Sequence, residues 1–191
     1  MAGFDLRALL VRVLASARAR PHPAGGPDQS SQPGGSQRTP VSYASTMTPV
    51  PALPARLRLR QLWNAANLTT PLGLVLALSA GCRVRRGPEG LLLAFGYRWG
   101  FPDGGAFTVG SMVLLRPHTA PTARLLAHES RHATQYAWCL GLPFLALYFA
   151  AAGWSLLRTG DPASRNAFER HAGLADGGYR ERPPRWPRRS V

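Results

Sequence analysis

The sequence contains no lysine: all 23 of its basic residues are arginine, and only nine residues are acidic. The formal net charge of +14 suggests a nucleic-acid partner, because clustered arginine binds phosphate. The distribution of the charge argues against this, since 13 of the arginines lie in residues 1–60 or 180–191. We therefore predict no specific nucleic-acid partner and only a weak electrostatic affinity for anionic surfaces.

Cysteine is also scarce, with Cys82 and Cys139 the only two in the chain. An iron–sulfur cluster normally takes about four thiolate ligands, so the sequence excludes that class of site. Neither cysteine belongs to a CxxC pair, which makes a zinc–thiolate site a weaker hypothesis than a histidine site. We expect both thiols to stay reduced in a cytoplasmic protein, and the sequence leaves a disulfide between them open.

Histidine occurs five times, and two of these residues lie in the pentapeptide HESRH at residues 128–132. On a helix, residues i and i+4 share a face, so His128 and His132 can bind one divalent metal ion while Glu129 stands beside its open position. This is the HExxH arrangement of zinc hydrolases. Apolar residues at helical spacing around the motif predict a helix. A helix surface that binds no metal is the alternative.

A catalytic zinc site normally needs a third protein ligand. The metzincin continuation would place a histidine at position 138, where this chain has Trp138. Among the later carboxylates Glu169 is the best placed, because residues 161–164 carry signals for the start of a short helix. His171 is an alternative ligand. The predicted metal ligands are therefore His128, His132 and Glu169.

HESRH followed, 37 residues after its second histidine, by ERHA resembles the HExxH…ExxA pattern of gluzincin-type zinc metallopeptidases. The resemblance implies that Zn²⁺ is bound by His128, His132 and Glu169. It also implies that Glu129 is the general base on zinc-bound water, and that the substrate is a peptide or protein. ExxxD-type gluzincins have a carboxylate one turn after the ligand glutamate, but this chain has Gly173 there, so a backbone carbonyl would have to orient one imidazole.

Residues 57–183 also resemble a family of small uncharacterised actinobacterial HExxH proteins that are sometimes labelled iron–sulfur oxidoreductases. The stretches that carry this resemblance are NLTTPLGL, LAHESRHATQYAWCLGLPF and NAFERHAGLADGGYRERP. The two cysteines of this chain do not support the iron–sulfur label.

The pattern before the HExxH motif predicts helices followed by strands. Residues 57–78 have helical spacing with a break at residues 69–71, and the second piece reads as a buried helix. Residues 82–86 and 91–97 predict a hairpin, and residues 106–115 predict a third strand. We therefore predict an α+β, zincin-like fold in which a small antiparallel sheet packs with the HExxH helix and flanking helices.

Composition divides the chain into three parts. Residues 21–54 are rich in proline, glycine, serine and glutamine, so we predict that residues 1–54 form a disordered or misassigned N-terminal extension, with Met47 as an alternative start. Residues 55–181 are expected to form a single zincin-like domain. Residues 182–191 form a basic C-terminal tail.

Residues 133–157 contain no charged side chain, and residues 139–157 approach the roughly 20 residues that cross a bilayer core. A single crossing would place His132 and Glu169 on opposite sides of the membrane, where they could not share a metal ion. Gly141 and Pro143 favour a turn instead. A buried or interfacial helix and a membrane span both stay open.

Two functional hypotheses follow. In the first, the protein is a cytoplasmic zinc-dependent metallohydrolase, a peptidase that uses Glu129 as general base, with peripheral membrane association as an option. In the second, it is a non-catalytic membrane-associated or metal-binding protein whose HExxH helix is structural. The sequence indicates neither the substrate nor the oligomeric state.

Overall fold

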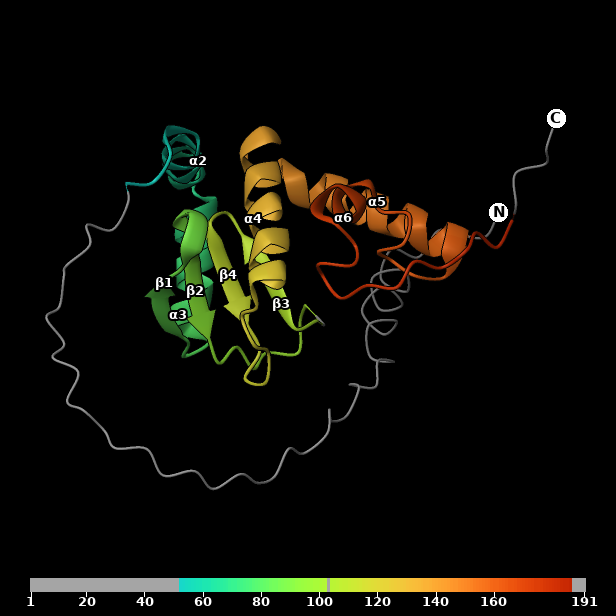
Figure 1. The fold of residues 1–191 in the computed structure, drawn as a ribbon, viewed down its shortest axis with the longest axis horizontal. Coiled ribbons are helices and arrows are strands. Elements are labelled where there is room, and N and C mark those ends of the chain that lie inside the picture. The colour runs from blue at the N-terminus through green and yellow to red at the C-terminus, as the bar shows by residue number, and fades with distance from the viewer. Residues whose placement is uncertain (1–51, 103, 187–191) are drawn as a thin grey trace, which may run out of the picture. The chain divides into compact units, whose positions relative to one another are not determined.

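The computed structural model describes residues 52–102 and 104–186 (Figure 1). The predicted N-terminal extension, residues 1–54, lies outside the described residues except for its last three positions. The predicted basic tail, residues 182–191, is described only as far as Trp186.

A four-stranded sheet forms the middle of the described fold, with strand order β1-β2-β4-β3. The hairpin predicted from the first two strand signals is present, because β1 and β2 pair antiparallel. β3 and β4 also pair antiparallel, whereas β2 and β4 run parallel. The strands are β1 (Arg83–Arg86), β2 (Leu92–Phe95), β3 (Ala106–Val109) and β4 (Met112–Leu115).

The sheet differs from its prediction in two respects. Residues 106–115, predicted as one strand, form the β3–β4 hairpin, which turns at Gly110 and Ser111. Gly110 has a φ of 63°, and a Cβ at this position would lie 2.5 Å from the backbone nitrogen of Thr70. Gly-Ser is a recognised hairpin signal. The predicted antiparallel sheet is in fact mixed, because residues 96–105 carry the chain to the far edge and β4 returns between β2 and β3.

Helices α2 (Ala55–Ala66) and α3 (Thr69–Ser79) are separated by a break at Asn67 and Leu68, slightly before the predicted break. α3 packs on one face of the sheet through its small residues: at Gly73 a Cβ would lie only 2.8 Å from Met112 Cβ. The prediction of a buried helix is wrong for α3, because only Thr69, Gly73 and Ala77 are buried; Leu76 is partly buried against the core, and the other three leucines of the helix are exposed.

α4 (Ala123–Trp138) covers the opposite face of the sheet, so that the sheet lies between α3 and α4 (Figure 1). All four residues of β4 are buried, as expected for a strand with both faces covered. Met112 and Leu114 pack on the side of α3, and Val113 and Leu115 pack on the side of α4. The α+β class is therefore confirmed.

The chain turns sharply after α4 and continues as α5 (Pro143–Thr159), with an angle of 119° between the two helices. The turn lies at the predicted position, where Gly141 has a φ of 93°. No single helix in residues 52–102 and 104–186 is long and apolar enough to cross a membrane, although α4 and α5 taken together pass by length and composition.

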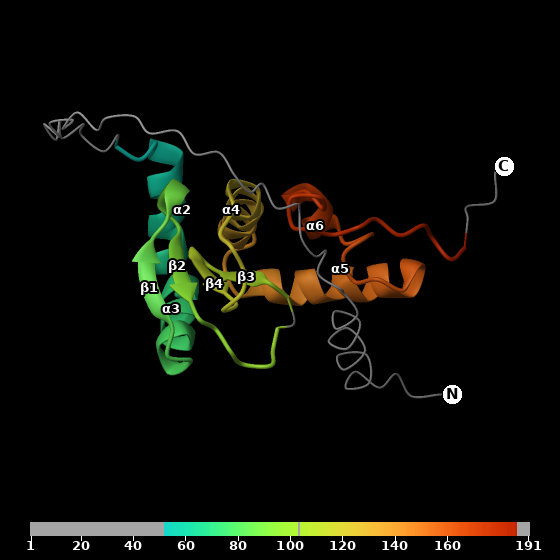
Figure 2. The same ribbon diagram turned by 60° about the horizontal axis from the view of Figure 1, so that its bottom comes forward.

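The last helix, α6 (Ala167–Ala172), packs against α4 and α5 (Figure 2). It is shorter than predicted, because it ends at Gly173 rather than at Gly177 and Gly178. The helix-start signal at Asp161 instead closes a turn, in which the Asp161 carboxylate accepts hydrogen bonds from the backbone of Ala163 and Ser164. Asn166 caps α6 through Phe168 N.

Candidate metal centre

The three predicted metal ligands meet at one buried point between α4 and α6. His128 Nε2 and His132 Nε2 are 3.0 Å apart. Glu169 Oε2 lies 3.4 Å from His128 Nε2, and Glu169 Oε1 lies 3.7 Å from His132 Nε2. All three residues are buried, and one ligand atom of each lies within 4.8 Å of the others. This group could hold a metal ion.

Hydrogen bonds at the far side of each ring set the orientation of both imidazoles. His128 Nδ1 is 3.1 Å from Ala172 O and 3.0 Å from Gly173 O, at the C-terminal end of α6. His132 Nδ1 is 2.8 Å from Gln135 Oε1. Carbonyl oxygens only accept hydrogen bonds, so in the neutral rings Nδ1 carries the proton and Nε2 presents a lone pair. The ring of His128 thus faces backbone carbonyls rather than a carboxylate.

The side-chain amide of Gln135 has a defined orientation of its own. Its Nε2 donates a 2.9 Å hydrogen bond to Phe168 O and lies 3.1 Å from His171 Nδ1, which leaves Oε1 to face His132. Gln135 therefore fixes the tautomer of His132 and also joins α4 to α6.

The centre contains acceptors without a matching donor. With both imidazoles neutral, two Nε2 lone pairs and the carboxylate of Glu169 point at one another, and Glu169 Oε2 is buried without a hydrogen bond to any residue of 52–102 and 104–186. A buried acceptor without a partner costs free energy, and a divalent cation bound by all three groups would remove that cost. Two imidazoles and one carboxylate are also ligands that a divalent metal ion binds, so these three residues fit a metal ion.

The pKa values of these groups reflect the same arrangement. Burial alone would raise the pKa of Glu169, but the adjacent imidazoles of His128 and His132 and the hydroxyl of Tyr148 lower it far below its usual value. Burial alone would lower the pKa of His132, but the neighbouring carboxylate of Glu169 raises it. In the metal-free protein the centre therefore favours a positive charge, which is the charge that a metal ion supplies.

Glu129, the predicted general base, lies beside the ligands and lines the same pocket. Its Oε2 accepts a 2.7 Å hydrogen bond from Thr108 Oγ1. Because Thr108 belongs to the edge strand β3, the sheet holds this carboxylate from one side while α4 carries it. Glu129 is thus buried and has a fixed orientation next to the metal ligands.

Tyr148 contributes to the centre from α5. Its hydroxyl donates a hydrogen bond to Glu169 Oε1. Burial raises the pKa of Tyr148 well above its usual value, and the nearby carboxylate of Glu169 raises it further. The hydroxyl therefore stays protonated and keeps donating to this oxygen, which fixes the carboxylate in place.

The ligands line a pocket of about 680 Å³ whose walls are mainly apolar. α3 contributes Leu72 and Leu76, and α5 contributes Phe144, Leu145 and Phe149. Further lining residues come from the segment before β3 and from β3 itself: Tyr97, Trp99, Phe101, Phe107 and Val109. The polar groups of the pocket are thus gathered at the metal centre.

The loop after α6 closes the site against α4. Arg131 Nη1 donates to Ala172 O at 2.5 Å and to Asp176 Oδ2 at 2.9 Å. Gly177 lies against the ring of His128, where a Cβ would approach Nε2 to 2.8 Å. A side chain at position 177 would therefore enter the space between the metal ligands and the loop.

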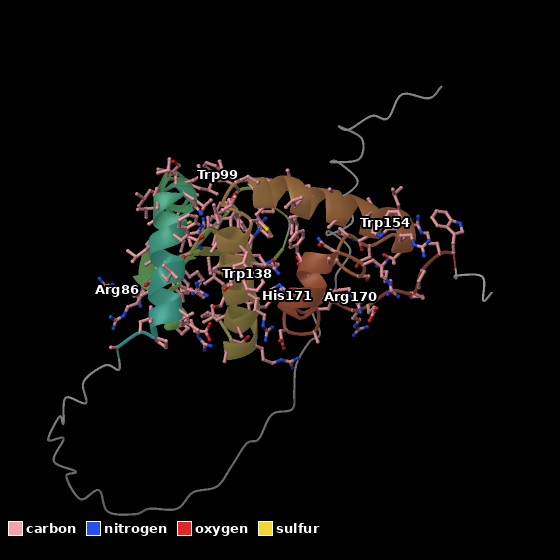
Figure 3. The ribbon with its side chains drawn as sticks, turned by 90° about the horizontal axis from the view of Figure 1, so that it is seen from above. Arg86, Trp99, Trp138, Trp154, Arg170 and His171 are labelled. Carbon is pink, nitrogen blue, oxygen red and sulfur yellow. The ribbon has the colours of Figure 1, made fainter. Side chains whose placement is uncertain are left out.

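His171, the alternative ligand, does not join the centre. It is exposed and lies beside the ring of Trp138, with 6.1 Å between the ring centroids (Figure 3). Its Nδ1 faces Gln135 rather than the other two histidines.

A second polar group, which we call the arginine cluster, consists of the buried residues Arg60 and Ser130 and the exposed Glu89. Arg60 Nη1 donates to Ser130 O at 3.1 Å and to Ser130 Oγ at 2.7 Å, and Arg60 Nη2 donates to Glu89 O. Ser130 Oγ donates to the Glu89 carboxylate. Burial lowers the pKa of Arg60, which Glu89 partly offsets. The cluster joins α4 to α2 and to the β1–β2 connection.

Sequence reasoning did not identify Gln135 or Thr108 as parts of the site. Gln135 had a usable signal, because it lies three residues after His132 and therefore on the same side of the helix. Thr108 had none, because only the packing of β3 against α4 brings it to Glu129.

Both cysteines are free, and Cys82 is buried in the core on the side of α3. Neither a protein-family model nor the sequence of a curated protein nor a solved structure matches this chain.

Proposed function

We propose that the protein is a zinc-dependent metallohydrolase of gluzincin type with a zincin-like fold, acting as a peptidase. The observation that carries the proposal is the acceptor-only group of His128, His132 and Glu169 with the buried carboxylate of Glu129 beside it. Two imidazoles and one carboxylate form a donor set used by catalytic zinc sites, which keep one further position open.

A zinc ion bound here would supply Lewis acidity for the attack of water on a carbonyl group. The protein residues would handle the proton. The Thr108 hydroxyl donates a hydrogen bond to Glu129 Oε2. Glu129 Oε1 is therefore the oxygen that would take a proton from the attacking water and return it to the leaving amine. Tyr148 acts as a positioning residue, because its hydroxyl donates a hydrogen bond to the Glu169 carboxylate.

The pocket indicates the class of substrate. Its apolar walls suit apolar side chains next to the bond that is cleaved, because polar groups occur in it mainly at the metal centre. β3 lies at the edge of the sheet and lines the pocket, so an extended peptide could pair with it and pass Glu129. We therefore propose an extended peptide with apolar side chains as the substrate.

The metal content of the purified, dialysed protein tests the ligand set. We expect one zinc ion per chain, and its loss in His128→Ala and in His132→Ala. The matched control is His118→Ala, because His118 is exposed and lies outside the ligand group. Iron in place of zinc would contradict the proposal, since two histidines and one carboxylate also bind iron in oxygenases.

Glu129→Gln separates a hydrolase from a non-catalytic metal-binding protein. The variant should keep its zinc, because Glu129 is outside the ligand group, and it should lose ~10²-fold or more in the turnover of a mixed peptide library. Cleavage products can be counted by mass spectrometry. Unchanged turnover in this variant would remove Glu129 from the mechanism, and no turnover in the zinc-loaded wild type would favour the non-catalytic alternative.

A further inference from the structure

Two helices of the fold are apolar on the side that faces away from the core. α3 exposes Val75 and Leu78 at 61% and 62%, and α5 exposes Leu147 and Trp154 at 50% and 59%. No charged side chain occurs in residues 61–82 or 133–157, which contain the whole of α3 and all of α5 up to Leu157. A helix on the surface of a water-soluble domain normally turns charged residues outward. The outer sides of α3 and α5 therefore lack the chemistry of a surface in contact with water alone.

These surfaces meet at the mouth of the metal-centre pocket. Leu72 from α3, Trp99 and Phe101 from the loop between β2 and β3, and Phe149 from α5 all line the pocket and are all exposed. α3, this loop and α5 lie along one side of the described fold (Figure 2). Trp99 lies on that side, and the exposed Trp154 lies on α5 (Figure 3). We call this surface, formed by α3, residues 99–101 and α5, the apolar face.

Arginine side chains border the apolar face. A second cleft, of about 530 Å³, lies at the C-terminal end of α3 and is lined by Arg83, Arg98 and Arg116. At the far end of α5, Arg158 lies 5.7 Å from the ring centroid of Trp154. The arginines are weakly opposed, because residues 52–102 and 104–186 contain 16 of them but only six acidic residues, of which three are buried.

Exposed apolar side chains, tryptophans at the boundary and a border of arginine together match the interface of an anionic membrane. Apolar side chains enter the boundary of the acyl chains, tryptophan rings lie at the level of the headgroups, and arginines contact the headgroup phosphates. No single described helix is long enough for a crossing, so the contact would be with the membrane surface.

We propose that the apolar face docks on the surface of an anionic lipid bilayer, so that the mouth of the metal-centre pocket opens towards the lipid. α3 and α5 lie in the plane of the interface, and the arginine-lined cleft contacts anionic headgroups. This inference concerns the surface around the pocket and does not depend on the metallohydrolase proposal.

Sedimentation of the full chain with lipid vesicles tests the inference. We expect binding to vesicles of phosphatidylcholine with about one third phosphatidylglycerol, at lipid concentrations at least about tenfold below those needed with phosphatidylcholine alone. Tryptophan fluorescence should shift to shorter wavelength on binding.

Matched tryptophan variants locate the contact. Trp99→Glu combined with Trp154→Glu should raise the required lipid concentration by about tenfold or more. Trp138→Glu is the control, because Trp138 is 73% exposed but lies away from the apolar face (Figure 3); its effect should stay below about twofold. Arg83→Gln with Arg98→Gln should weaken binding to the anionic vesicles only. Thermal unfolding shows that each variant is folded.

Three outcomes would overturn the inference. The first is no sedimentation of the wild-type chain with anionic vesicles. The second is an equal loss of binding in Trp138→Glu, which would show that added negative charge and not the apolar face is responsible. The third is a dimer that dissociates in the Trp99→Glu, Trp154→Glu variant without any vesicle binding by the wild type, which would make the face an interface between two copies.

Discussion

α4 takes part in two polar groups, and they differ in how hydrogen-bond donors and acceptors are balanced. In the arginine cluster, both terminal nitrogens of Arg60 donate to oxygens of Ser130 and Glu89, although the buried Arg60 Nε has no hydrogen-bond partner among residues 52–102 and 104–186. In the metal centre, by contrast, two imidazole lone pairs and a carboxylate face each other with no donor between them. Each group contains a buried charged side chain, Arg60 in the arginine cluster and Glu169 in the metal centre. The three groups of the metal centre could instead hold a cation from outside the chain.

The HESRH pentapeptide contributes to both groups. Its first, second and fifth residues, His128, Glu129 and His132, face the pocket, while Ser130 faces Arg60. The fourth residue, Arg131, attaches the end of α6 to the same helix. The two positions that the general motif leaves variable therefore hold the helix in place in this chain.

The largest expected effect comes from adding a donor to the metal centre. Glu169→Gln places an amide N–H₂ among the acceptors, where it can bond an imidazole lone pair. Zinc affinity should fall by more than the ~10–100-fold that loss of an outer hydrogen-bond partner costs. The metal-free variant should unfold at a lower urea concentration, because an ionised carboxylate with a lowered pKa stabilises the folded state.

Chelator competition measures the affinity of Glu169→Gln, and urea unfolding with EDTA measures its stability. The control is Glu181→Gln, whose carboxylate is half exposed and paired with Arg170. If Glu169→Gln bound zinc as tightly as the wild type, the acceptor-only interpretation of the centre would be wrong.

Arg60→Ala should act on the other group and leave the metal centre unchanged. It removes charged hydrogen bonds to Ser130 and Glu89, so we expect a loss of about 2–3 kcal/mol in the free energy of unfolding. Arg58→Ala, on the exposed side of the same helix, should change stability by less than about 0.5 kcal/mol. A drop in the zinc affinity of the folded Arg60→Ala protein would show that the two groups are not independent.

Gln135→Leu tests the orientation of His132. The substitution removes the acceptor for His132 Nδ1 and the donor to Phe168 O, so zinc affinity should fall by about 10–100-fold. Gln135→Glu keeps an acceptor at this position and should recover most of the loss. Equal affinities for the two variants would show that the connection to α6, and not the orientation of the imidazole, is what matters.

The smallest expected effect is that of Asp176→Ala, since this carboxylate lies outside the ligand group. Zinc affinity should change by less than about threefold, well below the loss for an outer partner of a ligand. Hydrogen bonds from Arg131 and then Arg124 lower the pKa of Asp176. The stability advantage of the wild type over this variant should therefore be present at neutral pH and should disappear as the pH falls through the lowered pKa. Urea unfolding at several pH values measures this difference.

The parts of the fold that the sequence predicted well are those with local signals. The HExxH helix follows from apolar spacing, and the turn before α5 follows from Gly141 and Pro143. The mixed sheet could not be predicted, because the pairing of β2 with β4 depends on the path of residues 96–105 rather than on any strand's own pattern. The exposure of α3 was also not predicted, because the sequence pattern of an apolar helix does not indicate whether its outer side packs against protein or is exposed.

The site shows the same division. Two ligands four residues apart on one helix are visible in the sequence, and Glu169 was reached through helix signals and the gluzincin pattern. The side chains that orient the site come from three other places: Gln135, one turn on, bonds to His132, Tyr148 in α5 bonds to Glu169, and Thr108 in the edge strand bonds to Glu129. Only tertiary packing brings the last two to the centre.

α6 has only six residues, too few for a helix that is stable by itself, yet it carries one ligand and the carbonyl groups that orient another. An ion shared by His132 and Glu169 would close a loop of 37 residues, as a disulfide does. In the chain-entropy description, such a cross-link contributes about 3–4 kcal/mol by restricting the unfolded chain. The ion would then act as a reversible cross-link. Its removal by a chelator should make the segment between α5 and α6 sensitive to proteases before the sheet and α4 unfold.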